Sequence, residues 1–134
     1  MSDSPHLLGE ALLRTYALDA NDDQSAMTYS IFDLSQEFDI TTRLIRHFEN
    51  EGLLSPVRDG SDRVYSQRDR TRLKLILRGK RLGFPMRDIH EIVETYNSST
   101  GELAQLTVLI DKIEIQRKFL EQQLEEVHLN LTEL

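Results

Sequence analysis

The residues with the clearest chemistry are polar side chains between positions 42 and 50. They form one face of a predicted helix whose other face carries Leu44, Ile45 and Phe48. Arginine can donate two hydrogen bonds to guanine, asparagine can pair with adenine, and threonine can contact phosphate or the thymine methyl group. The pattern therefore predicts a helix that reads DNA. The outward-facing residues are Thr42, Arg43, Arg46, His47, Glu49 and Asn50.

A preceding helix must hold this reading helix in place. Ser30 and Asp33 have the spacing of a capping box, and the apolar residues that follow predict a short helix over residues 31–38. After a tight break, Thr41 can cap the reading helix, which we expect to end at Gly52. Two short helices joined by a few residues form a helix-turn-helix unit.

A hairpin and a basic helix come next. Asp59-Gly60 is a strong turn signal inside residues 53–65, which predict a wing. Ser66 can cap the following helix, with Asp69 in the capping-box position. The many cations of this helix repel one another unless an anion neutralises them, and we expect that anion to be DNA phosphate. These cations are Arg68, Arg70, Arg72, Lys74, Arg78, Lys80 and Arg81.

The distribution of charge supports a nucleic-acid partner, although the whole chain has a net charge of −7. Residues 1–42, 43–87 and 88–134 carry net charges of −7, +7 and −7. A basic centre between acidic flanks is typical of a protein that contacts the phosphate backbone. On charge alone, a solvated charged surface is an equally good interpretation.

Composition excludes several classes of protein. The chain has 134 residues, enough for one modest domain with an appendage. It has no cysteine and no apolar run of membrane-spanning length, so thiolate sites are excluded and a cytoplasmic location is expected. The four histidines are scattered, so we predict no metal site and no cofactor. No phosphate loop, nucleophile with a base or convincing carboxylate pair is present, so we predict no enzymatic activity.

The last helix is expected to begin at a capping box formed by Ser99 and Glu102. It carries a seam of residues at alternating steps of three and four. Nine of its ten positions are apolar. At ~1.5 Å per residue the helix is about 48 Å long, more than the rest of the chain can cover. The pattern predicts a coiled coil, and the simplest partner is a second copy. The seam consists of Leu103, Leu106, Ile110, Ile113, Arg117, Leu120, Leu124, Val127, Leu131 and Leu134.

Arg117 is the charged exception in this seam. Its guanidinium can reach Glu114 or Glu121, pair with a carboxylate of the partner, or extend into solvent, and these alternatives stay open. Apolar residues outside the seam predict further packing against the partner's central domain, in preference to a ligand pocket. These residues are Val108, Leu109, Ile115, Phe119 and Leu129.

The first residues form a separate segment. Apolar side chains from Leu7 to Tyr16 follow Ser4-Pro5 at helical spacing and predict a short amphipathic helix. The acidic residues 19–25 predict a flexible linker. Two alternatives remain for this segment: Met27 is an alternative start, or residues 1–26 form a regulatory arm.

The stretch from Thr28 to about Tyr96 resembles the MerR family of bacterial transcription regulators. The resemblance rests on the string Ile45-Arg46-His47-Phe48-Glu49-Asn50-Glu51-Gly52-Leu53-Leu54-Ser55-Pro56, continued by Arg58, Arg63-Val64-Tyr65 and Leu82-Gly83-Phe84. Residues 72–84 look most like the branch that controls leucine and isovalerate utilisation. The implied fold is mainly α: a winged helix-turn-helix domain over 28–97, after an N-terminal extension (1–27) and before a dimerisation helix (98–134).

The resemblance also implies how the protein works. An antiparallel coiled-coil homodimer would place two recognition helices on a near-palindromic promoter operator and distort its spacer for RNA polymerase. Arg43 and Arg46 belong to the recognition helix, with Arg46 as a phosphate clamp, and Arg58, Arg63 and Tyr65 belong to the wing, where they too are expected to contact DNA. His47 stands where the family usually has an aromatic residue, and Pro85 where a capping serine or threonine is usual.

An effector and one rival function complete the expectations. No effector domain is expected after residue 134, so a small-molecule effector would have to fit between the coiled coil and the DNA-binding domain. The rival is a non-enzymatic coiled-coil interaction protein whose basic region binds an acidic protein. A steep loss of affinity for DNA with increasing salt would distinguish the two, because phosphate contacts release counterions.

Overall fold

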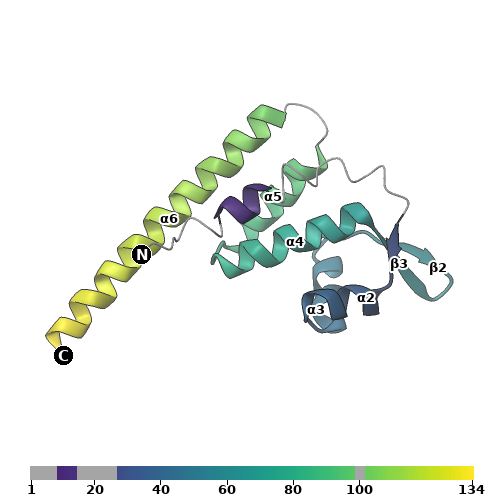
Figure 1. The fold of residues 1–134 in the computed structure, drawn as a ribbon, viewed down its shortest axis with the longest axis horizontal. Coiled ribbons are helices and arrows are strands. Elements are labelled where there is room, and N and C mark those ends of the chain that lie inside the picture. Colours follow the sequence, from purple (N-terminus) through teal and green to yellow (C-terminus); the bar gives the residue numbers. More distant parts are fainter. Residues whose placement is uncertain (1–8, 15–26, 99–101) are drawn as a thin grey trace.

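The computed structural model describes residues 9–14, 27–98 and 102–134. Residues 9–14 are helical. A helix-turn-helix, a hairpin and three further helices follow in the order expected from the sequence, and Figure 1 shows the long last helix on the side opposite the hairpin. The elements are β1 (Thr28–Tyr29), α2 (Ile31–Phe38), α3 (Thr42–Asn50), β2 (Val57–Asp59), β3 (Asp62–Ser66), α4 (Gln67–Arg81), α5 (Met86–Asn97) and α6 (Glu102–Glu133).

Side-chain caps fix where the helices begin. The Ser30 hydroxyl accepts a hydrogen bond from Asp33 N at 2.9 Å, and the Asp33 carboxylate accepts one from Ser30 N at 2.9 Å. Ser66 and Asp69 form the second capping box, and Thr41 caps α3 by accepting from Leu44 N at 3.1 Å. These three predicted caps, all within the described residues, are confirmed, because each depends only on residues within one helical turn.

The predicted hairpin is confirmed and belongs to a larger sheet. Strand β3 lies between β2 and β1 and is antiparallel to both. Arg58 stands opposite Arg63 in the hairpin, whose turn places Gly60 at a φ of 65°, a conformation that glycine adopts without strain. Strand β1 pairs Tyr29 with Tyr65 and so joins the beginning of the helix-turn-helix to the wing.

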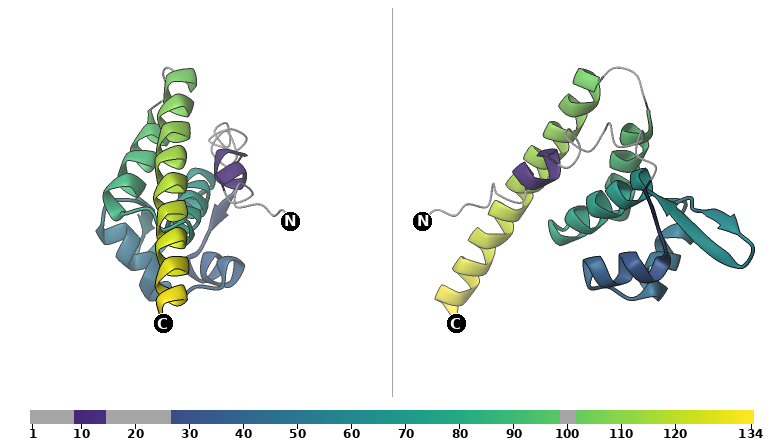
Figure 2. Two further views of the ribbon diagram at one scale, coloured as in Figure 1. Left: turned by 90° about the vertical axis from the view of Figure 1, so that its left-hand side faces the viewer. Right: turned by 45° about the vertical axis from the view of Figure 1, so that its right-hand side comes forward.

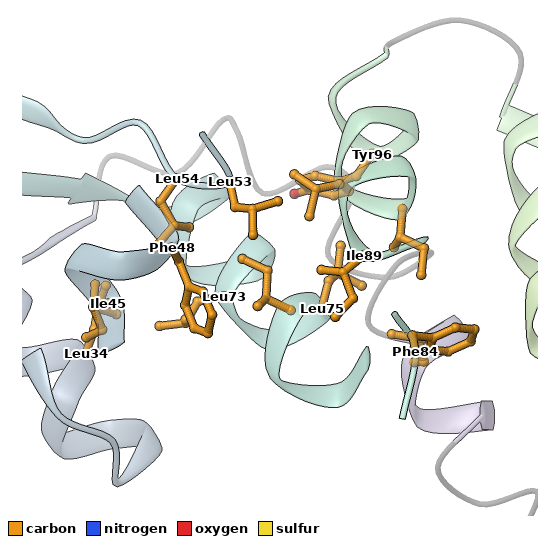
Figure 3. Packing of buried hydrophobic residues seen from close by; sticks show 14 of the residues in the cluster. Leu34, Ile45, Phe48, Leu53, Leu54, Leu73, Leu75, Phe84, Ile89 and Tyr96 are labelled. Atoms are coloured by element: carbon orange, nitrogen blue, oxygen red, sulfur yellow. The ribbon is translucent and has the colours of Figure 1, made fainter. Parts of the chain in front are cut away.

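A hydrophobic core lies between the helix-turn-helix and the following helices. Leu34, Ile45, Phe48, Leu73 and Ile76 are completely buried. Figure 3 shows such side chains filling the space between α3, α4 and α5. This packing fixes the orientation of α3, because its inner face cannot rotate out without exposing apolar surface.

Helix α5 starts without a side-chain cap, since Pro85 occupies the N-cap position. It packs against α6. Lys112 of α6 reaches Asp88 and Glu91 of α5 at 3.2 and 2.9 Å. Burial by itself lowers the pKa of Lys112, but its hydrogen bonds to Glu91 and Asp88 raise it overall.

Leu109 corrects one expectation about the last helix. We expected this residue to pack on the partner's central domain, but it is only 1% exposed within the single chain and belongs to the core. Leu109 lies on the face of α6 that is turned toward α5, because Lys112, one helical turn further along, pairs with Asp88 and Glu91 of α5. From Lys118 onward every residue of α6 is exposed, and this half of the helix projects away from the body (Figure 1).

Two expectations about the beginning of the chain and the start of α6 fall partly outside the described residues. Residues 9–14 confirm part of the predicted N-terminal helix, whereas Leu7, Leu8, Tyr16 and the linker lie outside. The capping box expected at Ser99 also lies outside. Among the helices described, none combines the length and the apolar character needed to cross a membrane.

Candidate nucleic-acid interface

Helix α3 presents a polar outer face built on a buried inner face. Ile45 and Phe48 anchor the helix in the core, while Arg43, Arg46 and His47 are exposed. Within the described residues, neither Arg43 nor Arg46 has a hydrogen bond or an ion-pair partner. These two guanidinium groups are therefore available to an external anion.

The remaining polar residues of α3 differ in exposure. Thr42 is half-buried in the first turn, whereas His47 and Asn50 are exposed at the same outer surface. The His47 side chain is exposed, and its ring centre lies 6.0 Å from that of the Phe48 ring. His47 can thus donate or accept a hydrogen bond at the surface where the sequence placed it.

Glu49 corrects the expectation that it belongs to the outward-facing residues with which α3 reads DNA. Its side chain is only 14% exposed and accepts hydrogen bonds from three groups of the wing. Arg63 Nε lies 2.8 Å from Oε1, Arg58 Nη2 lies 3.3 Å from Oε2, and the Tyr65 hydroxyl lies 3.2 Å from Oε1. We refer to Glu49, Arg58, Arg63 and Tyr65 as the wing clamp. It ties the hairpin to α3, so Glu49 is a positioning residue and not a base reader.

Tyr65 corrects the expectation that it contacts DNA. Its side chain is completely buried, and its hydroxyl is bound to Glu49. Burial, followed by the charge of Glu49, raises the pKa of the phenol far above its ordinary value. A ring enclosed in the core cannot touch a phosphate, so Tyr65 supports the wing from within.

Arg58 and Arg63 occupy intermediate positions. Arg58 is 57% exposed on strand β2 and keeps most of its side chain accessible, whereas the Arg63 side chain is 22% exposed. Both share the single carboxylate of Glu49. The wing clamp therefore retains an excess of positive charge next to the free arginines of α3.

The basic helix α4 corrects a second expectation, because several of its cations have partners inside the protein. Arg68 stacks 4.5 Å from the centre of the Tyr96 ring and donates to the Tyr96 carbonyl at 2.8 Å. Arg70 pairs with Glu37 of α2, and this pair lowers the pKa of Glu37. An external anion is therefore not needed to explain the presence of Arg68 and Arg70.

Two further cations of α4 are held in the same way. Arg72 donates to Asn97 Oδ1 at 2.7 Å and to Asp69 Oδ1 at 3.0 Å. Arg78 donates to the Ala11 carbonyl at 2.8 Å. The basic character of α4 mainly joins α4 to α2, α5 and the N-terminal segment, which no local sequence signal indicates.

The described residues contain no group of three or more histidine, aspartate or glutamate side chains that could hold a metal ion. The polar chemistry of the site is thus that of hydrogen bonds and cationic side chains. Its centre is the exposed pair Arg43 and Arg46, positioned by the core below and by the wing clamp beside it. This arrangement can bind a regularly spaced polyanion.

Comparisons with known proteins agree with this description. The family described as "MerR HTH family regulatory protein" matches residues 29–96, and the one described as "MerR, DNA binding" matches residues 70–134. None of the curated proteins matches the chain.

Three solved structures are similar. HiNmlR, a MerR family regulator lacking the sensor domain and bound to promoter DNA, is 25% identical with a TM-score of 0.53, over 74% of this chain and 80% of that one. A MerR family regulator from Bacillus cereus is 23% identical with a TM-score of 0.62, over 79% and 76% of the two chains. One from Bacillus thuringiensis is 18% identical with a TM-score of 0.60, over 81% and 100%.

The latter two similarities show the fold, a helix-turn-helix with a small antiparallel wing and a long last helix. The family match covers half of the chain and includes α3, the wing and α4. The chain therefore belongs to the MerR family of helix-turn-helix transcription regulators, which are DNA-binding proteins and not enzymes.

Proposed function

We propose that this regulator binds a near-palindromic promoter operator as a homodimer, with α3 in the major groove and the hairpin against the adjacent backbone. In this proposal residues 28–97 are the DNA-binding unit and residues 98–134 the dimerisation unit. The observation that carries it is the exposed pair Arg43 and Arg46, which have no partner in the part of the chain that the structure describes, on a helix anchored in the core. The similar regulator HiNmlR, which is bound to promoter DNA, supports it.

The contacts follow from the exposure of each side chain. We assign base or phosphate contact on α3 to Thr42, Arg43, Arg46 and His47, with Arg46 as a phosphate clamp. Arg58 has the more exposed side chain of the two arginines in the wing clamp. We assign it to contact with the DNA backbone, with Arg63 beside it. Phosphate contacts set the register of the protein on DNA, and base contacts give the sequence preference.

The homodimer is supported by the exposed half of α6. Leu124 and Leu131 are 68% and 65% exposed in the single chain. A continuous row of exposed apolar side chains is typical of a surface that another protein chain covers. In an antiparallel pairing over the whole seam, Leu103 faces the partner's Leu134, and Ile113 faces the partner's Leu124. Every position of the seam then has a counterpart in the second copy.

Arg117 fits this pairing without an unpaired charge. Its guanidinium lies 2.8 Å from Glu114 and 3.1 Å from Glu121, both on α6 itself. Within the single chain, Arg117 thus makes the contacts to Glu114 and Glu121 that were one of the alternatives left open by the sequence. The hydrogen bonds to Glu114 raise its pKa further, so the group stays charged.

The proposed action on transcription is distortion of the promoter spacer, so that RNA polymerase engages both promoter elements. A protein with this action would work in the cytoplasm, where the bacterial chromosome lies. Bending a site of this length costs about 1–6 kcal/mol, which added phosphate contacts must offset. The basic side chains of α3 and of the wing can supply such phosphate contacts on each half-site.

The genes controlled are a separate part of the proposal. The run of residues 72–84 is similar to the branch that regulates leucine and isovalerate utilisation. We therefore propose operators next to genes of branched-chain amino acid or acyl-CoA catabolism. Footprinting on such promoters, compared with the promoter beside this protein's own gene, tests it.

The alternative function is a coiled-coil interaction protein whose basic region binds an acidic protein. The separation of charge between residues 43–87 and both flanks is compatible with this function, because the carboxylates of an acidic protein can also pair with the cations of residues 43–87. Only nucleic acid, however, offers phosphates at the regular spacing that produces a strong salt dependence.

Arg46→Ala tests the DNA interface directly. We expect weaker binding to operator and non-operator duplexes alike, and a plot of log affinity against log salt whose slope is smaller by about 1 per lost phosphate contact. Fluorescence anisotropy with a labelled duplex at several salt concentrations measures both. Arg87→Ala is the matched control, because Arg87 is an exposed arginine of α5 outside the assigned interface. Equal DNA affinities for the Arg46→Ala variant and the unaltered protein would contradict the assignment of Arg46 as a phosphate clamp.

A further inference from the structure

The helical segment of residues 9–14 bridges α4 and α6, although it lies before the first residue of the family match. Leu12 is completely buried, and the Ala11 carbonyl accepts a hydrogen bond from Arg78 of α4 at 2.8 Å. A Cβ added to Gly9 would lie only 3.2 Å from Ile113 Cγ2 of α6. Figures 1 and 2 show the segment beside α6, facing the end of α4. We refer to residues 9–14 as the arm.

A pocket of about 360 Å³ opens between the arm and α6. The apolar residues that line it include Leu13 of the arm, Phe84 before α5, and Ile113, Leu120 and Leu124 of α6. The lining is mainly apolar, while Glu10 and Glu121 stand among the residues around it. Such a pocket is suited to aliphatic side chains.

The α6 wall of this pocket consists largely of the seam. Ile110, Ile113, Arg117, Leu120 and Leu124 are all seam positions, and all line the pocket. Antiparallel pairing over the whole seam places the partner's Leu124 opposite Ile113 and the partner's Val127 opposite Ile110. The pocket therefore coincides with the place that the second copy of α6 would occupy.

We propose that the arm forms one wall of the groove that receives α6 of a second copy, with the partner's Leu124 packed against Leu13 and Phe84. The inference rests on the proposed homodimer and adds a contact that the seam alone does not contain. A second copy suits the groove because its exposed Leu124, Val127 and Leu131 need apolar cover, and each copy offers both the groove and the occupant. Such reciprocal contact is what a twofold interface requires.

The arm also couples the dimer to the basic helix. Because Arg78 of α4 holds the Ala11 carbonyl, a partner helix that presses on Leu13 also fixes α4 relative to α6. The spacing of the two α3 helices on DNA depends on this relation. Loss of the arm should therefore weaken dimerisation first and operator binding as a consequence.

Leu13→Asp in the full chain tests the contact. We expect the dissociation constant of the dimer, measured by sedimentation over a concentration series, to rise at least about tenfold, the effect of losing a buried leucine. Arg14→Asp is the matched control, because Arg14 is exposed in the same segment and does not line the pocket. It should change the constant by less than about threefold, the effect expected of a surface charge.

Cross-linking gives a second readout that does not depend on stability. The chain has no cysteine, so Leu13→Cys and Leu124→Cys can be placed on separate copies with different tags. After mixing, a short bis-maleimide should join the two kinds of copy, and Arg14→Cys in place of Leu13→Cys should give much less product. A covalent product between the two tags can arise only between chains.

The outcomes separate the two proposals. If the unaltered protein is monomeric at all concentrations, the homodimer itself is wrong. If it is dimeric while Leu13→Asp has no effect and no cross-link forms, the arm contact is wrong and the homodimer stands. Tighter dimerisation of Leu13→Asp would show that the arm blocks the groove, which overturns the inference. Binding of an apolar dye to the intact dimer, abolished by Leu13→Asp, would assign the pocket to a small molecule instead.

Discussion

At the scale of single residues, Glu49 determines how much of the basic surface is free. It neutralises part of the charge of Arg58 and Arg63 and leaves Arg43 and Arg46 without partners among the described residues. A carboxylate thus divides four nearby arginines into two that it ties to α3, Arg58 and Arg63, and two that have no partner among the described residues. Its identity as a glutamate matters because only an ionised acceptor can serve three donors at once.

Glu49→Gln should separate the wing from α3. An amide cannot replace the charged acceptor for both guanidinium groups, and hydrogen bonds to charged groups contribute about 1.5–3 kcal/mol. We expect the free energy of unfolding to fall by about 1–3 kcal/mol and operator affinity to fall with it, because the wing is less well placed. Urea denaturation at fixed protein concentration measures the first, and anisotropy the second.

Glu94→Gln is the control for this prediction, since Glu94 is an exposed carboxylate of α5 far along the chain from the clamp. It should leave both quantities within about 0.5 kcal/mol, as expected for a surface position. A Glu49→Gln variant as stable as the Glu94→Gln variant would mean that the hydrogen bonds of the wing clamp are not needed to hold the wing on α3.

At the scale of helices and strands, the sequence predicts what is determined locally. The caps at Ser30, Thr41 and Ser66 depend on a residue three positions later, and the turn at Gly60 depends on its immediate neighbours. The order of helices and the wing could therefore be predicted. Local rules suffice there because each cap satisfies backbone groups of its own first turn.

The partners of the basic helix could not be predicted in this way. Arg70 meets Glu37, Arg72 meets Asn97, and Arg78 meets the Ala11 carbonyl, so each contact joins residues at least 25 positions apart. Only the tertiary arrangement brings these groups together. The same helix therefore looks like a phosphate-binding surface in the sequence and is in large part an internal connector in the structure.

The pair of Glu37 and Arg70 makes the contact between α2 and α4 sensitive to acid. The hydrogen bond from Arg70 lowers the pKa of Glu37 from 4.5. Above pH 4.5 the carboxylate is ionised in the folded and unfolded states, so the pair stabilises the fold fully. As the pH falls through 4.5 the unfolded state takes up the proton first, and the contribution is lost progressively down to the pKa of the folded state.

Glu37→Gln tests this dependence. Between pH 7 and pH 3, the unaltered protein should lose more of its free energy of unfolding than the variant does. Since the pair is partly exposed, the difference should be no more than about 1 kcal/mol. Urea denaturation at each pH, at one protein concentration, gives the comparison. Parallel losses in the two proteins would show that the pair contributes nothing measurable.

At the scale of the whole molecule, the acidic flanks and the basic centre have separate tasks. In the proposed dimer, α6 carries the acidic surface away from the α3 helices, as its position opposite the hairpin in Figure 1 suggests. The negative charge of α6 therefore opposes DNA binding little, because salt screens charges that are more than about 10 Å apart.

The direction and register of the seam give the last prediction. In an antiparallel pairing over its whole length, residue 124 faces the partner's Ile113, whereas residue 120 faces the partner's Arg117. Leu124→Asp would place an unpaired carboxylate against an isoleucine, which costs about 3–5 kcal/mol, so the dissociation constant of the dimer should rise more than about 100-fold. Leu120→Asp would meet a guanidinium and should weaken the dimer less.

The two variants distinguish antiparallel from parallel pairing because a parallel pair would bring each aspartate against its own copy. Both substitutions would then be about equally disruptive, since like charges would meet across the seam in each case. We expect Leu120→Asp to be at least about tenfold less disruptive than Leu124→Asp in sedimentation over a concentration series, a difference of about 1.4 kcal/mol. Glu125→Gln, at an exposed position outside the seam, controls for the change of charge on α6. Equal effects of the two aspartates would rule out the antiparallel register, and with it the opposition of Ile113 to the partner's Leu124.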